Sequence, residues 1–174
     1  MGERRYQRGF FHDQFRMDGR VALITGGHGE LAHAMAATLA DLGCDLVLAS
    51  RKQDKCEELA CELRATFGRQ VTALRCDVAK EEDVVATVAE TVARHGRLDV
   101  LVNNAGTSYW GLPEEIPLKG WQKVMDVNLT GTFLACREAA KVMIARGGGS
   151  IVNVASVGAY LSYRPSAGQV VPYT

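Results

Sequence analysis

The amino-acid sequence predicts an α/β fold in which a doubly wound parallel sheet lies between two layers of helices. Two observations predict this fold. Short apolar runs alternate along the chain with longer segments in which apolar residues recur every three or four positions, as in strands joined by crossover helices. The runs are also apolar at consecutive positions, which is typical of parallel strands covered by helices on both faces. We therefore expect a three-layer α/β/α domain.

The first half of the chain predicts two strands, each followed by a helix. Val21–Thr25 should form the first strand, and the helix after it should end at Gly43. That helix should bury the residues that recur at helical spacing: Leu31, Met35, Leu39 and Leu42. The second strand is expected at Asp45–Ser50. The next helix, over residues 54–67, should end at Gly68 and bury Cys56, Leu59, Ala60 and Leu63.

The second half predicts three further strands. Residues 71–76 should form the third, and the helix after it opens with acidic residues that suit the positive end of the helix dipole. This helix should bury four valines: Val84, Val85, Val88 and Val92. A fourth strand is expected at residues 99–103, and a long helix from about residue 118 to 146 should end at the glycines 147–149. Residues 150–155 predict a fifth strand, at the sheet edge unless further strands follow.

The length predicts one domain. At 174 residues the chain has the size of a single domain of roughly 100–200 residues. Residues 1–18 show no clear period, and their aromatic side chains suggest an arm that packs on the body or on a neighbouring subunit. We expect the domain itself to span residues 19–174.

The composition argues against nucleic-acid, membrane and metal partners. The 20 lysines and arginines balance 20 aspartates and glutamates, so no net charge attracts a polyanion. No apolar run approaches the roughly 18 residues of a membrane helix. Five cysteines without a C-x-x-C pair make neither a disulfide framework nor a zinc site, and the four histidines lack metal-ligand spacing. We expect a cytoplasmic protein with a small-molecule partner.

The turn after the first strand carries a nucleotide-binding pattern. Gly27-x-Gly29-x-x-Ala32 fits G-x-G-x-x-[G/A], in which one glycine makes the turn, the next lets a pyrophosphate approach the backbone, and the small third residue lets helix and strand pack closely. The amides at the helix start would face the phosphates. A glycine-rich turn can also be purely structural. The other strand ends decide between these interpretations, because ligands of doubly wound sheets bind there.

The end of the second strand indicates which nucleotide. An NAD-binding protein would place an acid there to bond the ribose 2′-hydroxyl, but this chain has Ser50-Arg51-Lys52. Arg51 could bind a 2′-phosphate with two parallel hydrogen bonds, and Lys52 adds charge. We therefore expect NADP rather than NAD, the alternative being that both are solvated residues at a helix start.

These strand ends together resemble the short-chain dehydrogenase/reductase family from about Gly19 onward. Thr25-Gly26 is similar to the opening of its glycine motif, Asp77-Val78 to its adenine-side pair, and Asn103-Asn104-Ala105-Gly106 to its N-N-A-G sequence. Asn128 falls in V-N-L-T-G, Ser156 ends a G-S-I-V-N-V-A-S strand, and Tyr173 looks like the start of Y-x-x-x-K.

The resemblance implies a Rossmann-fold oxidoreductase that transfers a hydride between a nicotinamide cofactor and a secondary alcohol or ketone. It implies that Tyr173 is the general acid/base, that Ser156 hydrogen-bonds the substrate oxygen, and that Asn128 holds a water in a proton relay. Cofactor contacts are assigned to Gly26, His28, Gly29, Leu31, Ser50, Arg51, Asp77, Val78, Asn104, Ala105 and Gly106. A homo-oligomer, dimer or tetramer, is expected for the full-length form.

Two departures from the family pattern matter. The usual T-G-x-x-x-G-x-G spacing would put glycines at 30 and 32, where this chain has Glu30 and Ala32; we expect Gly29 to take over the close approach, with Glu30 turned to solvent. The family's lysine is due at position 177, so we expect the chain to be part of a longer protein and, by itself, not to turn over substrate.

The substrate stays open. Trp110-Gly111 and residues 169–173 are similar to gluconate-dehydrogenase-like members, and Arg164 could receive a sugar-acid carboxylate. A reductase of 3-oxoacyl thioesters would share the same cofactor half. A different class, a non-catalytic dinucleotide-binding sensor or scaffold, would be compatible with Glu30.

Overall fold

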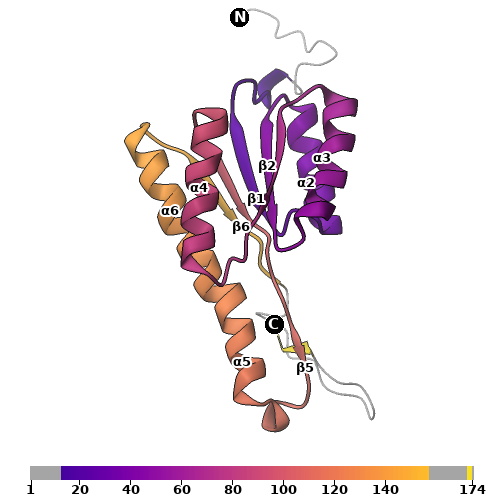
Figure 1. Ribbon diagram of the computed structural model, residues 1–174, viewed down its shortest axis with the longest axis vertical. Helices are drawn as coiled ribbons and strands as arrows, with labels where there is room; N and C mark the ends of the chain where they lie inside the picture. Colours follow the sequence, from indigo (N-terminus) through magenta and orange to yellow (C-terminus); the bar gives the residue numbers. More distant parts are fainter. Residues whose placement is uncertain (1–12, 157–171, 174) are drawn as a thin grey trace, which may run out of the picture.

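The structure, a computed structural model, describes residues 13–156 and 172–173 and confirms the predicted α/β architecture (Figure 1). Its main elements are β1 (Val21–Thr25), α2 (Glu30–Asp41), β2 (Asp45–Ser50), α3 (Gln53–Phe67), β3 (Val71–Arg75), α4 (Glu81–His95), β4 (Val100–Asn103), α5 (Leu118–Met125), η2 (Asp126–Gly131), α6 (Thr132–Ala145) and β6 (Ser150–Asn153). Two short strands, β5 (Tyr109–Trp110) and β7 (Pro172–Tyr173), and the one-turn helix η1 (Pro113–Glu115) lie outside this core.

The five core strands form one parallel sheet in the order β3-β2-β1-β4-β6. The chain moves outward from β1 to β3 and then crosses back to β4, so the strand order reverses beside β1. At the centre, Ile24 pairs with Leu48 on one side and with Val102 on the other. Such a reversal opens a crevice outside the carboxyl ends of the two central strands.

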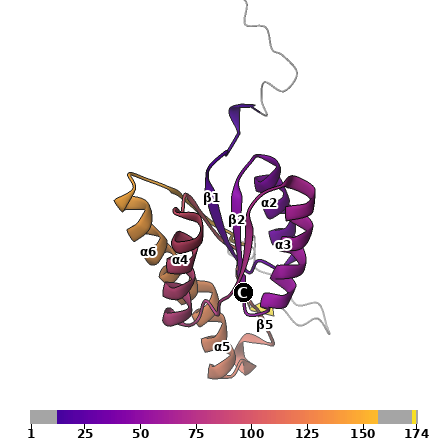
Figure 2. The same ribbon diagram turned by 45° about the horizontal axis from the view of Figure 1, so that its top comes forward.

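Helices cover both faces of the sheet. In Figures 1 and 2, α2 and α3 lie on one side and α4 and α6 on the other. Alternate positions of the strands accordingly point into two separate cores: Ala22 and Ile24 pack with the α2–α3 side, whereas Leu23 and Val47 pack with the α4–α6 side. This two-sided burial explains why the strand sequences are apolar at consecutive positions.

Helix α2 packs by a different face from the one expected. Ala32, Ala36 and Ala40 are the buried residues, while Met35 and Leu39 are only partly buried and Leu31 is 65% exposed. A row of alanines allows a helix axis to approach the sheet closely, and this places the longer side chains at its flanks. The expected stripe was therefore only partly correct: Met35 and Leu39 pack against the edge of the core, whereas Leu31 does not.

The predicted interior of α4 needs a similar correction. Val84 and Val88 are buried as expected, but Val85 is 43% exposed and Val92 only partly buried. The remaining interior positions are Thr87 and Thr91, whose hydroxyls donate to carbonyls four residues earlier, Asp83 and Thr87 respectively. Threonines whose hydroxyls donate to carbonyls of their own helix can occupy a core face. Apolarity alone therefore predicted only part of the buried face of α4.

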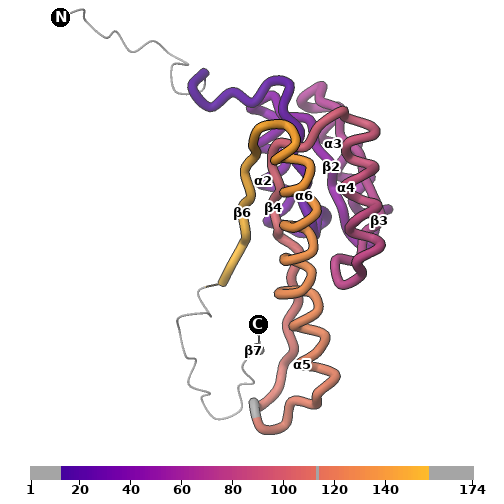
Figure 3. The backbone as a smooth tube through the Cα atoms, turned by 90° about the vertical axis from the view of Figure 1, so that its left-hand side faces the viewer, coloured from indigo at the N-terminus to yellow at the C-terminus, as the bar shows by residue number. Residues whose placement is uncertain are grey.

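The expected long helix between residues 118 and 146 is continuous in direction but changes type. The segment η2, between α5 and α6, is a π-helix. Figure 3 shows α5 continuing the line of α6 beyond the end of the sheet. π-Helical segments are rare and recur at functional sites, and this one carries Asn128.

Among the described residues, strand β6 forms the edge of the sheet and has β4 as its one neighbour (Figure 3). It ends at Asn153, two residues earlier than expected. Ile151 and Val152 are 37% and 47% exposed.

Within the described residues no helix is long and apolar enough to cross a membrane. The proposed arm lies outside the described residues up to position 12, as does Arg164.

Candidate active site

Two adjoining cavities lie at the carboxyl ends of the strands. The smaller, about 80 Å³, lies between the ends of β1, β2 and β3, and its walls include Gly26, His28, Ser50, Arg51, Asp77 and Val78. The larger, about 590 Å³, lies between β4, β6 and η2, and its walls include Leu31, Asn104, Asn128 and Ser156. Ala105, Gly106 and Thr107 line both. Most of the sequence-predicted residues that the structure describes thus collect around one continuous crevice, and Gly29 is the described one that lines neither cavity.

In the glycine turn after β1, the glycines have other roles than the sequence pattern predicts. Gly26 makes the turn with φ +65°, and a Cβ there would lie 2.9 Å from Ala105 Cα. Gly27 instead lets the turn approach β2, since a Cβ there would lie 2.9 Å from Leu48 Cβ. Gly29 has no such neighbour, its nearest being Gly26 O at 3.6 Å. Close packing therefore explains why positions 26 and 27 are glycines, but it does not explain Gly29.

Thr25 fastens the ends of β1 and β4 together. Its buried Oγ1 accepts the backbone N–H groups of Asn104 and Ala105, both at 3.1 Å. Asn104 Nδ2 in turn donates to the carbonyls of Thr25 and Gly26 at 3.2 and 3.3 Å. The Asn104 side chain thus fixes the backbone of Thr25 and Gly26 at the bottom of the crevice.

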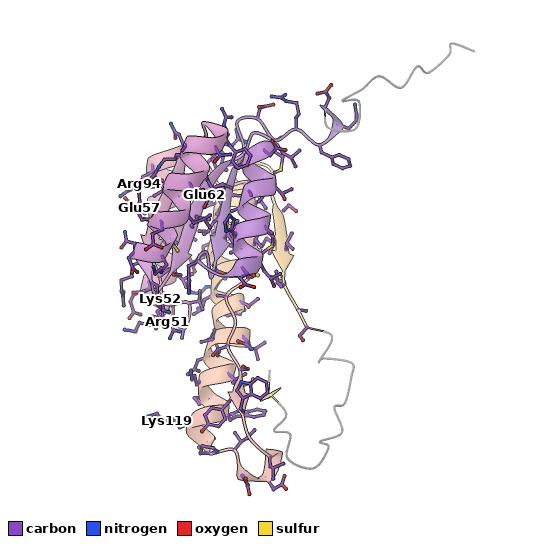
Figure 4. All side chains as sticks on the ribbon, turned by 90° about the vertical axis from the view of Figure 1, so that its right-hand side faces the viewer. Arg51, Lys52, Glu57, Glu62, Arg94 and Lys119 are labelled. Atoms are coloured by element: carbon purple, nitrogen blue, oxygen red, sulfur yellow. The ribbon has the colours of Figure 1, made fainter. Side chains whose placement is uncertain are left out.

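At the end of β2, the Ser50 side chain is buried, whereas those of Arg51 and Lys52 are exposed. Ser50 is buried, and its Oγ pairs with the backbone of Lys52, accepting the N–H at 3.0 Å and donating to the carbonyl at 3.1 Å. Arg51 and Lys52 are exposed and lie beside one another (Figure 4). Neither has an ion-pair partner within residues 13–156 and 172–173. Arg51 lines the smaller cavity, and Lys52 adds a second positive charge beside it.

The Asp77–Val78 segment is fixed by two neighbours. Asp83 accepts the N–H of Asp77 at 2.9 Å. Gly131, the last residue of η2, touches Val78 so closely that a Cβ would lie 2.9 Å from both Cγ2 and O of Val78. Nearby, burial raises the pKa of the Cys76 thiol, so it adds no negative charge to this cavity.

Asn128 binds the backbone of Thr107. Its Oδ1 accepts the Thr107 N–H at 2.8 Å, and its Nδ2 donates to the Thr107 carbonyl at 2.9 Å. The carbonyl of Asn128 accepts the Thr132 hydroxyl at 2.9 Å. The side-chain amide is therefore engaged with the strand-to-loop connection after β4, directly beside Gly106.

Ser156 and Tyr173 lie in the last part of the described chain. Ser156 lines the larger cavity and is exposed. Tyr173 lies on β7, which pairs antiparallel with β5 so that its Cα is the partner of Tyr109. The Tyr109 ring packs closely against Gly120, where a Cβ would lie 2.8 Å from the ring.

Four polar residues of the larger cavity were not predicted from the sequence: Thr107, Ser108, Thr132 and Asn153. Asn153 Oδ1 accepts Nδ2 of Asn103 at 2.8 Å, and that amide also lies 3.2 Å from Cys136 Sγ. For Thr107 and Ser108 the available signal was their position immediately after the N-N-A-G sequence. For Thr132 and Asn153 only the three-dimensional arrangement gives one. Within the described residues no cluster of histidine, cysteine and acidic side chains could hold a metal ion.

Comparison with known proteins gives a consistent result. Residues 20–169 match the family described as short chain dehydrogenase. D-threitol dehydrogenase of Mycolicibacterium smegmatis is 38% identical over 142 residues, covering 82% of this chain and 54% of that protein. 2-Dehydro-3-deoxy-D-gluconate 5-dehydrogenase of Bacillus subtilis is 34% identical, covering 86% of this chain and 58% of that protein.

Solved structures agree. The gluconate 5-dehydrogenase of Burkholderia cenocepacia J2315, crystallised with NADP and tartrate, superimposes with a TM-score of 0.82 at 37% identity, covering 88% of this chain and 60% of that one. The NADPH-dependent 3-quinuclidinone reductase of Rhodotorula rubra gives a TM-score of 0.84 at 36% identity, covering 88% and 58%. The chain thus spans little more than half the length of these relatives.

Proposed function

Because the chain belongs to the short-chain dehydrogenase family, we propose that it belongs to an NADP-dependent oxidoreductase acting on a secondary alcohol or ketone. The observation that carries the proposal is the continuous crevice at the carboxyl ends of the strands. Its smaller cavity would hold the adenosine part of the nucleotide, and its larger cavity the nicotinamide and the substrate.

The residues fit a dinucleotide at this position. Gly29 has no packing role, and a Cβ at Gly106 would lie 3.8 Å from its nearest neighbour, Asn128 Oδ1. Both glycines thus leave backbone open to a ligand, and Gly29 immediately precedes α2, whose N–H groups would face the pyrophosphate. Glu30 is exposed in the first turn of α2, which agrees with its expected orientation toward solvent.

The choice of NADP rests on Arg51 and Lys52. An arginine without a carboxylate partner can form two parallel hydrogen bonds to a phosphate. The acid that would bind a ribose 2′-hydroxyl is replaced here by Ser50, whose hydroxyl is engaged with Lys52. The solved relatives named above include an NADP complex and an NADPH-dependent reductase, which supports the same choice.

The chemistry follows from the groups around the larger cavity. When bound, a nicotinamide nucleotide supplies or accepts the hydride. Ser156 would hydrogen-bond the substrate oxygen as charge develops there, and Tyr173 would hold the proton that this oxygen gains or loses. A free tyrosine has a pKa near 10, so Tyr173 needs a nearby positive charge to act at neutral pH. Asn128 would keep Thr107 in place. Because the Asn128 side-chain amide is engaged with the Thr107 backbone, a water held at Asn128 would bind another atom of that residue.

For the substrate we propose a polyol or sugar acid. Threitol and gluconate derivatives appear in the names of the relatives given above, and the larger cavity offers hydroxyls and amides, namely Thr107, Ser108, Asn153 and Ser156. A 3-oxoacyl thioester would use the same cofactor half, and a non-catalytic sensor would bind nucleotide without turnover.

The test is cofactor binding by the full chain, followed through NADPH and NADH fluorescence. We expect tighter binding of NADPH, and we expect Arg51→Asp to narrow or reverse this preference. It should weaken NADPH by about tenfold or more, because a hydrogen bond to a charged group is worth about 1.5–3 kcal/mol. Arg94→Asp is the matched control, since it makes the same charge change at a distance from Arg51 (Figure 4). Equal affinities of the parent chain for both nucleotides would rule out the NADP assignment.

A further inference from the structure

A third cavity, of about 470 Å³, lies at the amino ends of β1, β4 and β6. The strands are parallel, so this cavity is at the opposite end of the sheet from the proposed cofactor crevice, the upper end in Figure 1. Its volume is in the range of small-molecule sites. Four guanidinium groups form its walls: Arg16, Arg20, Arg97 and Arg146.

These arginines come from three places that the fold brings together. Arg16 and Arg20 precede β1, Arg97 lies between α4 and β4, and Arg146 directly follows α6. The glycines 147–149 complete the wall without side chains. Gly147 and Gly148 have φ of +91° and +145°, a backbone that other residues rarely adopt, so this part of the wall is main chain.

One carboxylate orients two of the arginines. Asp99 accepts hydrogen bonds from Arg97 Nε at 2.6 Å and Nη2 at 2.5 Å, from Arg20 Nη1 at 3.0 Å, and from the Val21 N–H at 2.9 Å. It therefore holds two guanidinium groups in place but cancels only one positive charge. A preformed arrangement of this kind lowers the ordering cost of binding a ligand.

The remaining charges leave the cavity strongly positive. Arg16 pairs with Asp18, whereas Arg146 donates only to the Gly96 carbonyl, at 3.1 Å, and has no carboxylate partner in the described part of the chain. Four arginines against Asp18 and Asp99 give a net charge of +2.

We propose that this cavity binds a small phosphate-bearing anion at a site separate from the cofactor crevice. Guanidinium groups match the tetrahedral oxygens of a phosphate with paired hydrogen bonds. The nearly neutral whole chain makes this local concentration of positive charge a specific feature rather than part of a general basic surface. The opposite end of the sheet leaves the nucleotide crevice accessible at the same time.

The test is calorimetric titration of the full chain with inorganic pyrophosphate at constant ionic strength, with and without saturating NADPH. We expect one saturable site that persists when NADPH is present. Arg16→Gln and Arg146→Gln should each weaken it by about tenfold, the effect of losing a hydrogen bond to a charged group. Neither substitution touches Asp99, and the thermal midpoint of each variant should confirm that it folds.

Arg94→Gln is the matched control, because Arg94 lies on α4 outside the cavity and pairs with Glu90. It should bind pyrophosphate like the parent chain. Equal weakening by all three substitutions would mean general charge attraction and would overturn the proposal. So would binding that disappears with NADPH, which places the anion in the nucleotide crevice, or the absence of saturable binding. Citrate should bind more weakly, and equal binding would overturn the assignment to phosphate.

Discussion

At the scale of single residues, Asn128 acts on the backbone of a neighbouring segment. Its amide satisfies both polar groups of Thr107, and Thr107 lines both cavities of the crevice. The sequence indicated Asn128 through its setting in V-N-L-T-G, but its partner could not be predicted, because it depends on how η2 meets the loop after β4.

Asn128→Ala should therefore reduce stability as well as nucleotide binding. It leaves the N–H and carbonyl of Thr107 without their partner, and an unpaired partly buried group costs about 1–3 kcal/mol. Urea unfolding of the full chain measures this loss. Thr130→Ala, at an exposed position of the same π-helix, should have little effect. Equal unfolding midpoints for the two variants would contradict the assigned role of Asn128.

Asp99 predicts a specific dependence of stability on pH. Burial alone would raise the pKa of Asp99, but hydrogen bonds from Arg97, the Val21 N–H and Arg20 lower it to about 2. Its contribution is therefore complete above the unfolded-state pKa, near 3.9, and is lost as the pH falls toward 2. Asp99→Asn should be less stable than the parent at pH 6, and the gap should narrow between about pH 4 and pH 2. A gap that stays constant across this range would exclude this linkage.

At the scale of elements, small residues decide how helices approach the sheet. Alternating apolar runs and glycine stops predicted the five strands and four of the flanking helices. They did not predict which face of a helix is buried, because Ala32, Ala36 and Ala40 pack α2 while Leu31 lies at the crevice. The π-helix was not predicted either; its residues Asn128 and Gly131 contact Thr107 and Val78, which are distant in the sequence.

Two glycine substitutions should separate fold from ligand binding. Gly131→Ala gains helix propensity but forces a Cβ against Val78, so we expect a net loss of about 1–2 kcal/mol. Gly29→Ala meets no close neighbour and should keep the stability while weakening NADPH. Thermal unfolding and fluorescence titration of both variants measure this. If Gly29→Ala bound NADPH normally, the pyrophosphate would not approach there.

At the scale of the whole molecule, the outer helices suggest self-association. Leu118, Leu129 and Phe133 on α5, η2 and α6 are 58–78% exposed, and Trp121 is 42% exposed, so these residues present apolar surface on the part of the molecule that extends beyond the sheet. Surfaces of this kind mark interaction sites. Sedimentation velocity should show a mass of at least two 18.9-kDa chains, reduced by Phe133→Glu. A monomer at all concentrations would contradict the expected homo-oligomer.

The proposed function requires a nicotinamide dinucleotide to bind along the carboxyl ends of the strands. Hydrogen exchange of the full chain, with and without NADPH, tests it most directly, because the readout is local and does not require turnover. NADPH should slow exchange in residues 26–31, 50–52, 77–79 and 104–108, and leave residues 16–20 and 146–150 unchanged. Slowing confined to these last two segments, or no slowing anywhere, would exclude nucleotide binding in the crevice.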